Sequence, residues 1–423
     1  MSVLVFEDRQ VSDLYPITIG RPAFAVTCGS VRLVDLLVEF EQPVHVLVRP
    51  HLAALVESDF LQVTTAGGSS PGRSSASDSQ PLLVVNARLV PSIAARDRLL
   101  AIQRAGRPGV VRTGEAIAAA VLPPGGVPDG TAASSDALTA HLDVLDLSPL
   151  EVKLPLFDFP HDVIRHHLTS LADHLTERIA RGPYREIADD VFVAEGATLA
   201  RHVIHDTSGG PIVLDRGASI GPFCYLEGPI YVGPNGRVIE HASVKGGVAL
   251  GHTTKVGGEV EATIIEPYTN KQHHGFMGHS YLGSWINLGA GTCNSDLKNT
   301  YGTVNMDYGG RRVPTGMQFV GAILGDYAKT AINTGLFTGK TVGVCSMLYG
   351  SVTTNVPSFV NYARSFGQVT ATPVDVIIAS QARMFARRNV PQRPCDLQLI
   401  RDMFELTQAE REEGGVPIEP LSL

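Results

Sequence analysis

Residues 214–256, LDRGASIGPFCYLEGPIYVGPNGRVIEHASVKGGVALGHTTKV, place an aliphatic side chain at every sixth position. These positions are Leu214, Ile220, Leu226, Val232, Val238, Val244, Leu250 and Val256. Neither an α-helix, with its 3.6-residue period, nor a single strand, with a period of two, produces this spacing. A parallel β-helix of triangular cross-section does, because each flat face takes one short strand and three hexads complete a coil. The stretch therefore predicts a hexapeptide-repeat β-helix with the aliphatic side chains inside.

The same register extends in both directions from this stretch. It is visible upstream at Ile187, Val193 and Leu199, and downstream at Leu282, Leu288, Leu324, Leu336, Val342 and Leu348. The register is interrupted at roughly 200–213, 262–281 and 293–320, and we expect these segments to be loops that leave the prism. Insertions on a repeat scaffold usually carry the binding surface, so the later breaks draw attention as candidate sites.

Composition limits the class of protein. The chain has 423 residues, enough for two or three domains, and a net charge of −8, so nothing in its charge indicates nucleic-acid binding by bulk electrostatics. Its five cysteines are scattered without a CxxC pair, which favours a reduced compartment. Charged residues occur by the seventh position of MSVLVFEDRQ, and no run of eighteen apolar residues follows. We therefore expect a cytoplasmic protein without membrane insertion.

The residues outside the repeat predict further domains. Short apolar runs at 3–6, 44–48 and 82–86 alternate with a helical pattern at 31–39, which is typical of an α/β domain. Residues 64–80 and 124–135 are rich in Ser, Gly and Pro and are expected to be loops. We expect an α/β domain over 1–158, a connecting helix over 159–182, the β-helix over 183–362, and a C-terminal helical segment and tail over 363–423. Within that last segment, 373–407 is expected to be helical with an interruption at 391–394.

Two segments carry a resemblance to a known family. HHGFMGHSYLG at 273–283 and INLGAGT at 286–292, followed by Asn294, resemble the bifunctional GlmU family. Members of that family join a nucleotidyltransferase domain to a left-handed β-helix acetyltransferase. The resemblance covers most of 183–360. The N-terminal half is similar only to a divergent subgroup of sugar nucleotidyltransferases, through Phe6-Glu7-Asp8 and the segments 14–22 and 86–91. The resemblance implies a homotrimer that uses acetyl-CoA.

The resemblance also implies roles for individual residues of the repeat. His273 falls on the position of the catalytic general base, which would take a proton from an attacking amine. Asn287 and Asn294 fall near substrate-contacting positions, and the backbone of Ala290 falls where acetyl-CoA binds. Phe276 replaces a tyrosine of the better-known enzymes, so a hydroxyl contact is absent there.

The sequence does not single out the basic residues that would bind the phosphate of a substrate. Glu261 stands where the resemblance implies a substrate lysine, so the identity of the phosphosugar is open. Lys245, Lys255 and Lys271 are candidates for the missing charge, and spacing does not choose among them. Residues that could reach a phosphate of CoA are Lys298, Arg364, Arg383, Arg387 and Arg388.

The N-terminal domain lacks the Gly-rich loop that holds nucleotide phosphates in ordinary sugar nucleotidyltransferases. The remaining candidates there are Arg21 and Arg88 as phosphate contacts and Asp8 as a ligand of Mg²⁺, against an ordinary role as fold-bracing ion pairs.

The hypothesis that follows is an acetyl-CoA-dependent N-acetyltransferase. Its acceptor would be an amino sugar phosphate resembling glucosamine 1-phosphate, or an amino sugar nucleotide. The activity would belong to the synthesis of UDP-N-acetylglucosamine or another cell-envelope sugar, with nucleotidyl transfer as a second, coupled activity.

Two alternatives remain open. His274 and His279 have the spacing of two zinc ligands in γ-class carbonic anhydrases, with His241 as a third. The other alternative is a non-catalytic trimeric scaffold.

Overall fold

The computed structural model describes residues 1–66, 80–127, 134–419 and 421–422. The chain forms two compact units. The N-terminal unit comprises Met1–Leu14, Arg21–Thr27 and Val31–Phe159, and the β-helix unit comprises Tyr15–Gly20, Cys28–Ser30 and Pro160–Leu423. Two short segments of the N-terminal sequence thus belong to the β-helix unit. The expected loops at 64–80 and 124–135 lie in large part outside the described residues.

The N-terminal unit is an α/β domain, as predicted. Its six-stranded sheet has the order β3-β2-β1-β4-β6-β5. The strands are β1 (Ser2–Phe6), β2 (Val44–Leu47), β3 (Thr64–Thr65), β4 (Leu82–Asn86), β5 (Gly109–Thr113) and β6 (Ala116–Leu122). Strands β1 to β4 pair in parallel, whereas β6 runs antiparallel to both of its neighbours.

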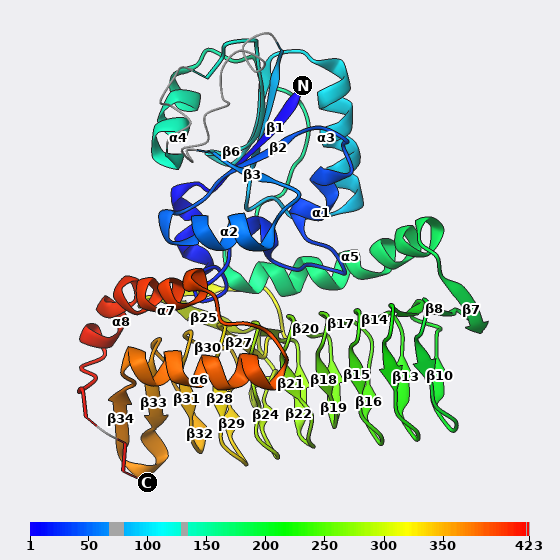
Figure 1. Ribbon diagram of the computed structural model, residues 1–423, viewed down its shortest axis with the longest axis vertical. Coiled ribbons are helices and arrows are strands. Elements are labelled where there is room, and N and C mark those ends of the chain that lie inside the picture. Colours follow the sequence, from blue (N-terminus) through cyan, green and yellow to red (C-terminus); the bar gives the residue numbers. More distant parts are fainter. Residues whose placement is uncertain (67–79, 128–133, 420, 423) are drawn as a thin grey trace. The chain divides into compact units, whose positions relative to one another are not determined.

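Helices cover both faces of this sheet. They are α1 (Leu33–Val38), α2 (Ala53–Asp59), α3 (Ile93–Ala105) and α4 (Ser135–Val144), with short 3-10 turns at Arg9–Leu14, Ala23–Ala25 and Pro50–Leu52. Alternate residues of β1 enter two different apolar clusters: Val3 packs with Leu99 of α3, and Leu4 with Leu138 of α4. This period-two alternation places α3 and α4 on opposite sides of the sheet, as Figure 1 shows.

The β-helix unit is a prism with three sheet faces, named here in the order in which a coil visits them. Face 1 contains β7 (Arg185–Ala188), β8 (Val191–Val193), β11 (Ile212–Leu214), β14 (Ile230–Val232), β17 (Val248–Leu250), β20 (Ile264–Ile265), β23 (Tyr281–Leu282), β27 (Ala322–Leu324) and β30 (Lys340–Val342). Face 2 contains β9 (Thr198–Leu199), β12 (Ser219–Ile220), β15 (Arg237–Val238), β18 (Lys255–Val256) and β21 (Asn270–Lys271). It continues through Asn287 into β28 (Lys329–Thr330), β31 (Met347–Leu348), β33 (Val360–Ala363) and β34 (Gln368–Ala371). Face 3 contains β10 (Ile204–Asp206), β13 (Tyr225–Glu227), β16 (Ser243–Val244), β19 (Glu259–Glu261) and β22 (Phe276–Gly278), followed by β24 (Cys293–Asn294), β29 (Gly335–Leu336) and β32 (Ser351–Val352).

The repeat read from the sequence forms the interior of this prism. All eight aliphatic residues between Leu214 and Val256 lie in one continuous buried cluster, each with at most 2 % of its surface exposed. Strand pairing between successive coils is parallel on every face, and Leu214 pairs with Val232, which pairs in turn with Leu250. The prediction of a hexapeptide β-helix is therefore confirmed.

Two of the three expected loops are instead part of the prism, so those predictions are wrong. Residues 200–213 contain β10 and most of β11, and residues 262–281 contain β20, β21, β22 and the first residue of β23. The coil after Leu250 is short, because Leu250 pairs with Ile265, fifteen residues later. A strict six-residue spacing in the sequence is therefore interrupted at this coil, although the β-helix itself continues. The third expected loop does leave the prism: between β24 and β27 the chain forms the antiparallel hairpin of β25 (Asn305–Tyr308) and β26 (Arg311–Pro314).

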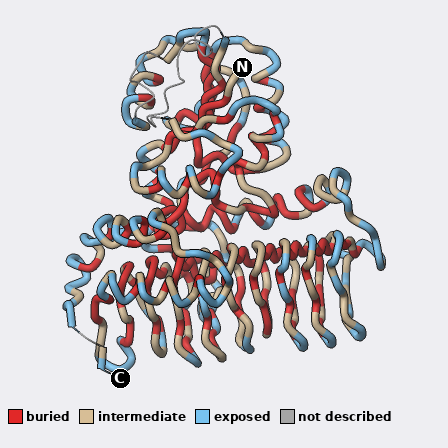
Figure 2. Tube along the Cα trace, in the orientation of Figure 1, coloured by how far each residue is buried: buried red, intermediate tan, exposed pale blue. Residues whose placement is uncertain are grey.

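Helices flank the prism. Helix α5 (Pro160–Arg181) packs Leu171 and Leu175 against Val213, Tyr231 and Ala249, the outward residues of face 1. The C-terminal segment forms α6 (Val374–Arg387), α7 (Pro394–Leu406) and α8 (Gln408–Glu413) and is interrupted where the prolines predicted it. Figure 2 shows buried residues concentrated along the side of the prism that α5 covers. Among the described helices, none is long and apolar enough to cross a membrane.

Candidate functional site

The sequence-predicted residues His273, Asn287 and Ala290 come together at one edge of the prism, here called the His273 corner. The edge lies between β21 on face 2 and β22 on face 3. Gly275 has a φ of +125° there, and a Cβ on it would overlap the carbonyl oxygen of Thr292 on the next coil. A Cβ on Gly257 would likewise overlap the carbonyl oxygen of Gln272. Glycine is therefore required for three successive coils to stack closely at this edge.

Strand register places the three predicted residues on adjacent coils. Asn270 pairs with Asn287 across the two coils, and the backbone N–H of Gly291 donates to the carbonyl oxygen of His274 at 3.1 Å. Ala290 consequently lies one rung from His273, a rise of about 4.8 Å. His273 and Asn287 are both exposed. Within the described residues the His273 ring makes no hydrogen bond, so both of its nitrogens are open to a ligand.

Lys271 supports this corner from inside the prism. It occupies the inward position that Val256 holds on the preceding coil, and only 2 % of its surface is exposed. Its ammonium donates to the carbonyl oxygen of Gly257 at 2.8 Å and to that of His273 at 2.5 Å. Burial lowers the pKa of Lys271 from 10.5 to about 8, and the nearby Cys293 acts in the opposite direction. A lysine at a core position thus holds the backbone of the predicted base.

The structure also separates the three candidate lysines. Lys245 is outward on face 3 and forms an ion pair with Glu259 at 2.5 Å, which is the largest cause of its raised pKa. Lys271 is occupied by two carbonyl oxygens. Lys255 is outward on face 2 beside Arg237, and in the described part of the chain it has no carboxylate within ion-pair distance. Of the three, Lys255 is the one whose charge is available to an anion.

Asn294 holds two coils together. Its side chain is 5 % exposed, donates to the carbonyl oxygen of Gly278 at 3.0 Å, and accepts from the N–H of Gly278 at 2.8 Å. Both ends of the amide are therefore engaged with β22. Phe276 pairs with Glu259 on face 3, and Lys298 lies at the start of the segment that leaves the prism. Their predicted ligand contacts stay predictions.

The histidines of the zinc alternative have other neighbours. The ring of His279 is hydrogen-bonded to Asp296 at 2.8 Å, and the ring of His241 stacks on Phe223 at a centroid distance of 5.3 Å. His274 is exposed at the His273 corner. Across the described ranges, no three His, Cys, Asp or Glu side chains are grouped so that they could hold a metal ion. The structure of the single chain thus gives the zinc alternative no support.

In the N-terminal unit, Asp8 and Arg88 bind each other. The guanidinium of Arg88 is fully buried and donates to Asp8 Oδ1 at 2.8 Å and Oδ2 at 2.7 Å. Its remaining N–H groups donate to Gln10, Asp158 and the carbonyl oxygen of Phe157. All five donors of the guanidinium are engaged, so a phosphate would have to displace an internal partner. Asn86 also donates to Asp8, at 2.7 Å.

The sequence does not reveal a second buried pair beside this one. Glu7 is 1 % exposed and accepts from the backbone N–H of Ala23 at 2.8 Å and from the side chain of Arg49 at 3.0 Å. Arg49 also donates to the carbonyl oxygen of Arg21, whose side chain is 9 % exposed. The Phe6-Glu7-Asp8 segment therefore braces the end of β1 through two ion pairs.

A pocket of about 160 Å³ adjoins Asp8 at the end of β1. Ligands of open α/β sheets bind at this edge, where the parallel strands end. The charged residues that line the pocket are Asp8, Arg9, Glu115 and Asp143. Mg²⁺ needs carboxylate oxygens that are free to coordinate, whereas those of Asp8 are engaged by Arg88 and Asn86. These residues do not fit a resident Mg²⁺.

Comparisons with known proteins agree with the two-part architecture. Residues 3–179 match the family described as sugar nucleotidyl transferase. The bifunctional protein GlmU of Ralstonia pickettii is 33 % identical over 123 residues, which are 28 % of this chain and 26 % of that protein. Over that segment the chain is similar to GlmU. A bifunctional sugar-1-phosphate nucleotidylyltransferase/acetyltransferase of Sulfurisphaera tokodaii is 26 % identical over 148 residues, 34 % of this chain and 37 % of that protein.

The similarity to these relatives is partial. The matches to the first relatives span about a quarter of those proteins' lengths. A solved UDP-N-acetylglucosamine acyltransferase from Francisella novicida aligns with 52 % of this chain and 78 % of its own, at 14 % identity and a TM-score of 0.24. The β-helix assignment rests on the strand pairing itself.

Proposed function

We propose that the β-helix unit is an acetyl-CoA-dependent N-acetyltransferase whose acceptor is an amino sugar phosphate, similar to glucosamine 1-phosphate, or an amino sugar nucleotide. The observation that carries the proposal is the His273 corner. It brings an exposed histidine with an unengaged ring, an exposed Asn287 and the backbone of Ala290 onto two adjacent coils. The names of the relatives, which include an acetyltransferase, support the same reaction class.

The chemistry requires few groups. The acceptor nitrogen attacks the thioester carbonyl carbon, a C–N bond forms, and the C–S bond breaks to release the CoA thiolate. His273 takes the proton that the amine loses and can return it to the departing sulfur. A positioned general base contributes about 10²–10⁴-fold to such a step. Asn287 would orient the acceptor through its amide, and the ammonium of Lys271 keeps the backbone of His273 in place.

Assembly as a homotrimer is part of the proposal. Nothing in the described chain orients the His273 ring, and a neighbouring subunit at this edge would supply the missing wall of the site. A cytoplasmic location and a place in the synthesis of UDP-N-acetylglucosamine or another cell-envelope sugar complete the proposal.

The test is a thiol-release assay with acetyl-CoA and a panel of acceptors that includes glucosamine 1-phosphate and several amino sugar nucleotides. We expect release that depends on one acceptor, with a stoichiometric N-acetylated product found by mass spectrometry. A folded, trimeric protein that releases no thiol with any acceptor and binds no CoA would contradict the proposal and favour the scaffold alternative.

The match of residues 3–179 makes nucleotidyl transfer the second candidate activity. The geometry at Asp8 and Arg88 weighs against it, because each already satisfies the other. Pyrophosphate release from UTP and N-acetylglucosamine 1-phosphate in the presence of Mg²⁺ would establish the activity. Its absence, in protein that acetylates an acceptor, would assign the N-terminal unit a structural role.

A further inference from the structure

Four cations gather on or beside face 2, within two coils of the His273 corner. Arg237 pairs in register with Lys255, and Lys255 pairs with Asn270, so the outward side chains of β15, β18 and β21 form one column. Arg387 ends helix α6, and Arg388 follows it. The Arg388 guanidinium donates to Asn270 Oδ1 at 2.6 Å, which brings the end of α6 onto the same column. We call Arg237, Lys255, Arg387 and Arg388 the basic cluster.

Packing holds the end of α6 in this position. Phe385, in the last turn of α6, is 3 % exposed, and its ring stacks on Trp285 of the prism at a centroid distance of 4.3 Å. Trp285 stacks in turn on Tyr268 at 4.1 Å. Trp285 and Phe385 are a hundred positions apart in the sequence, and their contact fixes the end of α6 against the prism.

The basic cluster has no internal counter-charge. In the described residues, no carboxylate lies within ion-pair distance of any of its four members. Burial is the largest cause of the lowered pKa of Lys255, and the charges of Arg388, Arg237 and Arg387 follow. The pKa of Arg388 is lowered by burial, then by Arg387 and Arg237. Like charges held together without compensation repel one another, and a bound anion would remove that cost.

The chemistry of the cluster indicates the anion. Three guanidinium groups and one ammonium suit phosphate oxygens, because arginine presents paired N–H donors to them and lysine adds a point charge. Two linked phosphoryl groups present more oxygen acceptors along the column than one phosphate monoester does, and so can contact more of the four cations. We propose that the basic cluster binds the diphosphate group of a nucleotide ligand.

The column also gives the ligand a direction. Arg388 donates to Asn270, and Asn270 Nδ2 lies 3.5 Å from Asn287 Oδ1 on the next coil. Lys255 is two rungs from Asn287 and Arg237 is three, which are about 10 and 14 Å along the prism. A ligand held by its diphosphate can therefore extend along face 2 to the His273 corner. This direction rests on the proposed acetyl transfer, whereas binding of the diphosphate does not.

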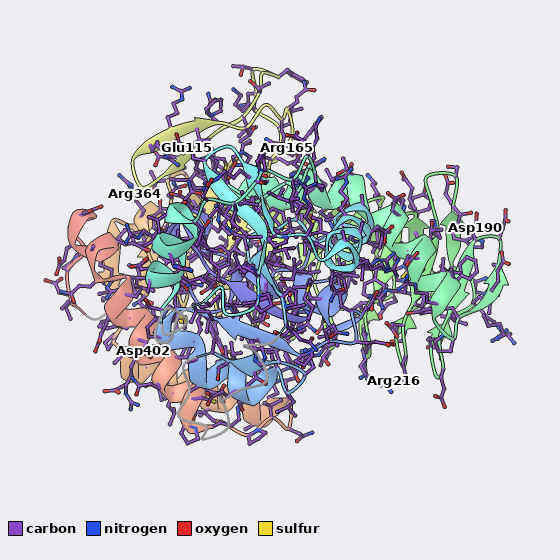
Figure 3. All side chains as sticks on the ribbon, turned by 90° about the horizontal axis from the view of Figure 1, so that it is seen from above. Glu115, Arg165, Asp190, Arg216, Arg364 and Asp402 are labelled. Carbon is purple, nitrogen blue, oxygen red and sulfur yellow. The ribbon has the colours of Figure 1, made fainter. Side chains whose placement is uncertain are left out.

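The test is calorimetric titration of the full-length protein with inorganic pyrophosphate, then with CoA and with UDP-N-acetylglucosamine. We expect pyrophosphate to bind, and the double substitution Arg237→Gln with Lys255→Gln to weaken binding by about 100-fold, about tenfold for each lost charge-assisted contact. The control is Arg216→Gln, which removes an exposed arginine at another edge of the prism, where Figure 3 shows it projecting outward. It should leave the affinity unchanged.

The outcomes separate the sources of the diphosphate. Competition between pyrophosphate and CoA, with a common loss in the double variant, supports the site and identifies the nucleotide as CoA. Competition with the sugar nucleotide supports the site and identifies that ligand instead. The proposal is overturned if pyrophosphate does not bind the wild type, as would follow if carboxylates of a second copy neutralised the cluster. Equal affinity in wild type and double variant also overturns it.

The two proposals can fail separately. A protein that binds pyrophosphate through the basic cluster but transfers no acetyl group would retain the anion site and lose the acetyltransferase assignment. A protein that transfers acetyl groups but binds pyrophosphate equally well in the wild type and the double variant would retain the activity and lose the site. Circular dichroism of each variant shows whether the prism remains folded, and Arg387→Gln, at an exposed helix end, provides a further variant with little risk to folding.

Discussion

Asp8 and Arg88 of the N-terminal unit and His273 and Asn287 of the β-helix unit are polar residues with opposite surroundings. Arg88 is fully buried, the side chain of Asp8 is 10 % exposed, and the two neutralise each other, with every N–H of the Arg88 guanidinium engaged. The other two are exposed, and the ring of His273 has no partner in the described chain. An unpaired buried charge is strongly destabilising, so it needs a partner within the protein. An exposed polar group is solvated by water and remains available to bind a ligand. The β-helix unit is therefore where binding and catalysis are expected.

The largest expected effect is on catalysis at the His273 corner. His273→Ala should lower kcat for acetyl transfer by about 10²–10⁴-fold, because the proton of the attacking amine loses its acceptor. His274→Ala is the matched control, since His274 is the exposed neighbour on the same corner, and it should stay close to wild type. Steady-state kinetics on both variants, with melting temperatures, make the measurement. A fully active His273→Ala enzyme would remove the assigned base.

The second-largest effect is expected on the stability of the N-terminal unit, at the ion pair between Asp8 and Arg88. Arg88→Met should destabilise the N-terminal unit by about 3–5 kcal/mol, because the carboxylate of Asp8 is left buried without its ion pair. Arg107→Met, at an exposed arginine, should change little. Hydrogen exchange of the β1 and β4 amides reports on this unit alone. If exchange is unchanged and nucleotide binding is lost instead, then Arg88 is a ligand contact and the comparison between the two regions breaks down.

Lys271 lies between these two cases, since it is buried and yet adjacent to the His273 corner. The unfolded chain holds the lysine proton up to a pKa of 10.5, whereas the folded chain holds it only up to about 8. Unfolding therefore takes up a proton in that window, and the stability of the wild type should rise as pH increases from about 8 to 10.5. The full gain is on the order of 3 kcal/mol.

Lys271→Met should lack this rise and should be at least as stable as the wild type at pH 7, because no charge remains to be buried. Urea unfolding of both proteins across the pH range tests the expectation. Parallel stability curves would show that the ammonium is not buried as described. A lowered kcat in Lys271→Met at unchanged KM would indicate that Lys271 positions the His273 backbone.

The smallest effect is expected at Lys245, a site candidate that already has a partner. Its ion pair with Glu259 is more than a third exposed on both sides, so Lys245→Met should change stability by at most about 1 kcal/mol. Acceptor KM should change by no more than about twofold. Lys255→Met provides the contrast, since the charge it removes is unpaired. A large rise in acceptor KM for Lys245→Met would indicate that Lys245 contacts the acceptor.

Much of the fold follows from local pattern. The eight aliphatic residues of 214–256 sit inside the prism because a period of six has few structural solutions. The interruption at 391–394 separates α6 from α7, since proline removes a backbone donor and favours helix starts. The loops expected at 200–213 and 262–281 failed for an equally local reason. Coils of this prism differ in length: Val193 pairs with Leu214 twenty-one residues later, and Leu250 with Ile265 fifteen residues later, so a fixed eighteen-residue template follows neither coil.

Only part of the candidate site could be predicted from the sequence. His273, Asn287 and Ala290 are found by their place in the short segment that carries the resemblance, and strand register then puts them on adjacent coils. No spacing rule shows that Lys271 points inward or that Lys245 is paired with Glu259, because both facts depend on register after the short coil. Asp8 and Arg88 are eighty residues apart, and their pairing needs β1 and β4 to be neighbours.

By itself, the sequence determined the β-helix, the α/β domain that precedes it, the helices that follow it and the region of the His273 corner. Each of these depends on periodicity or on a contiguous segment, which are local properties of a chain. Only the tertiary structure decided which charges are available. Arg88 is paired with Asp8, Lys245 is paired with Glu259, and Lys271 donates to two carbonyl oxygens. Arg388, by contrast, lies near Lys255 because α6 packs against the prism. The availability of a charge is a property of its neighbours, and those neighbours come from distant parts of the chain.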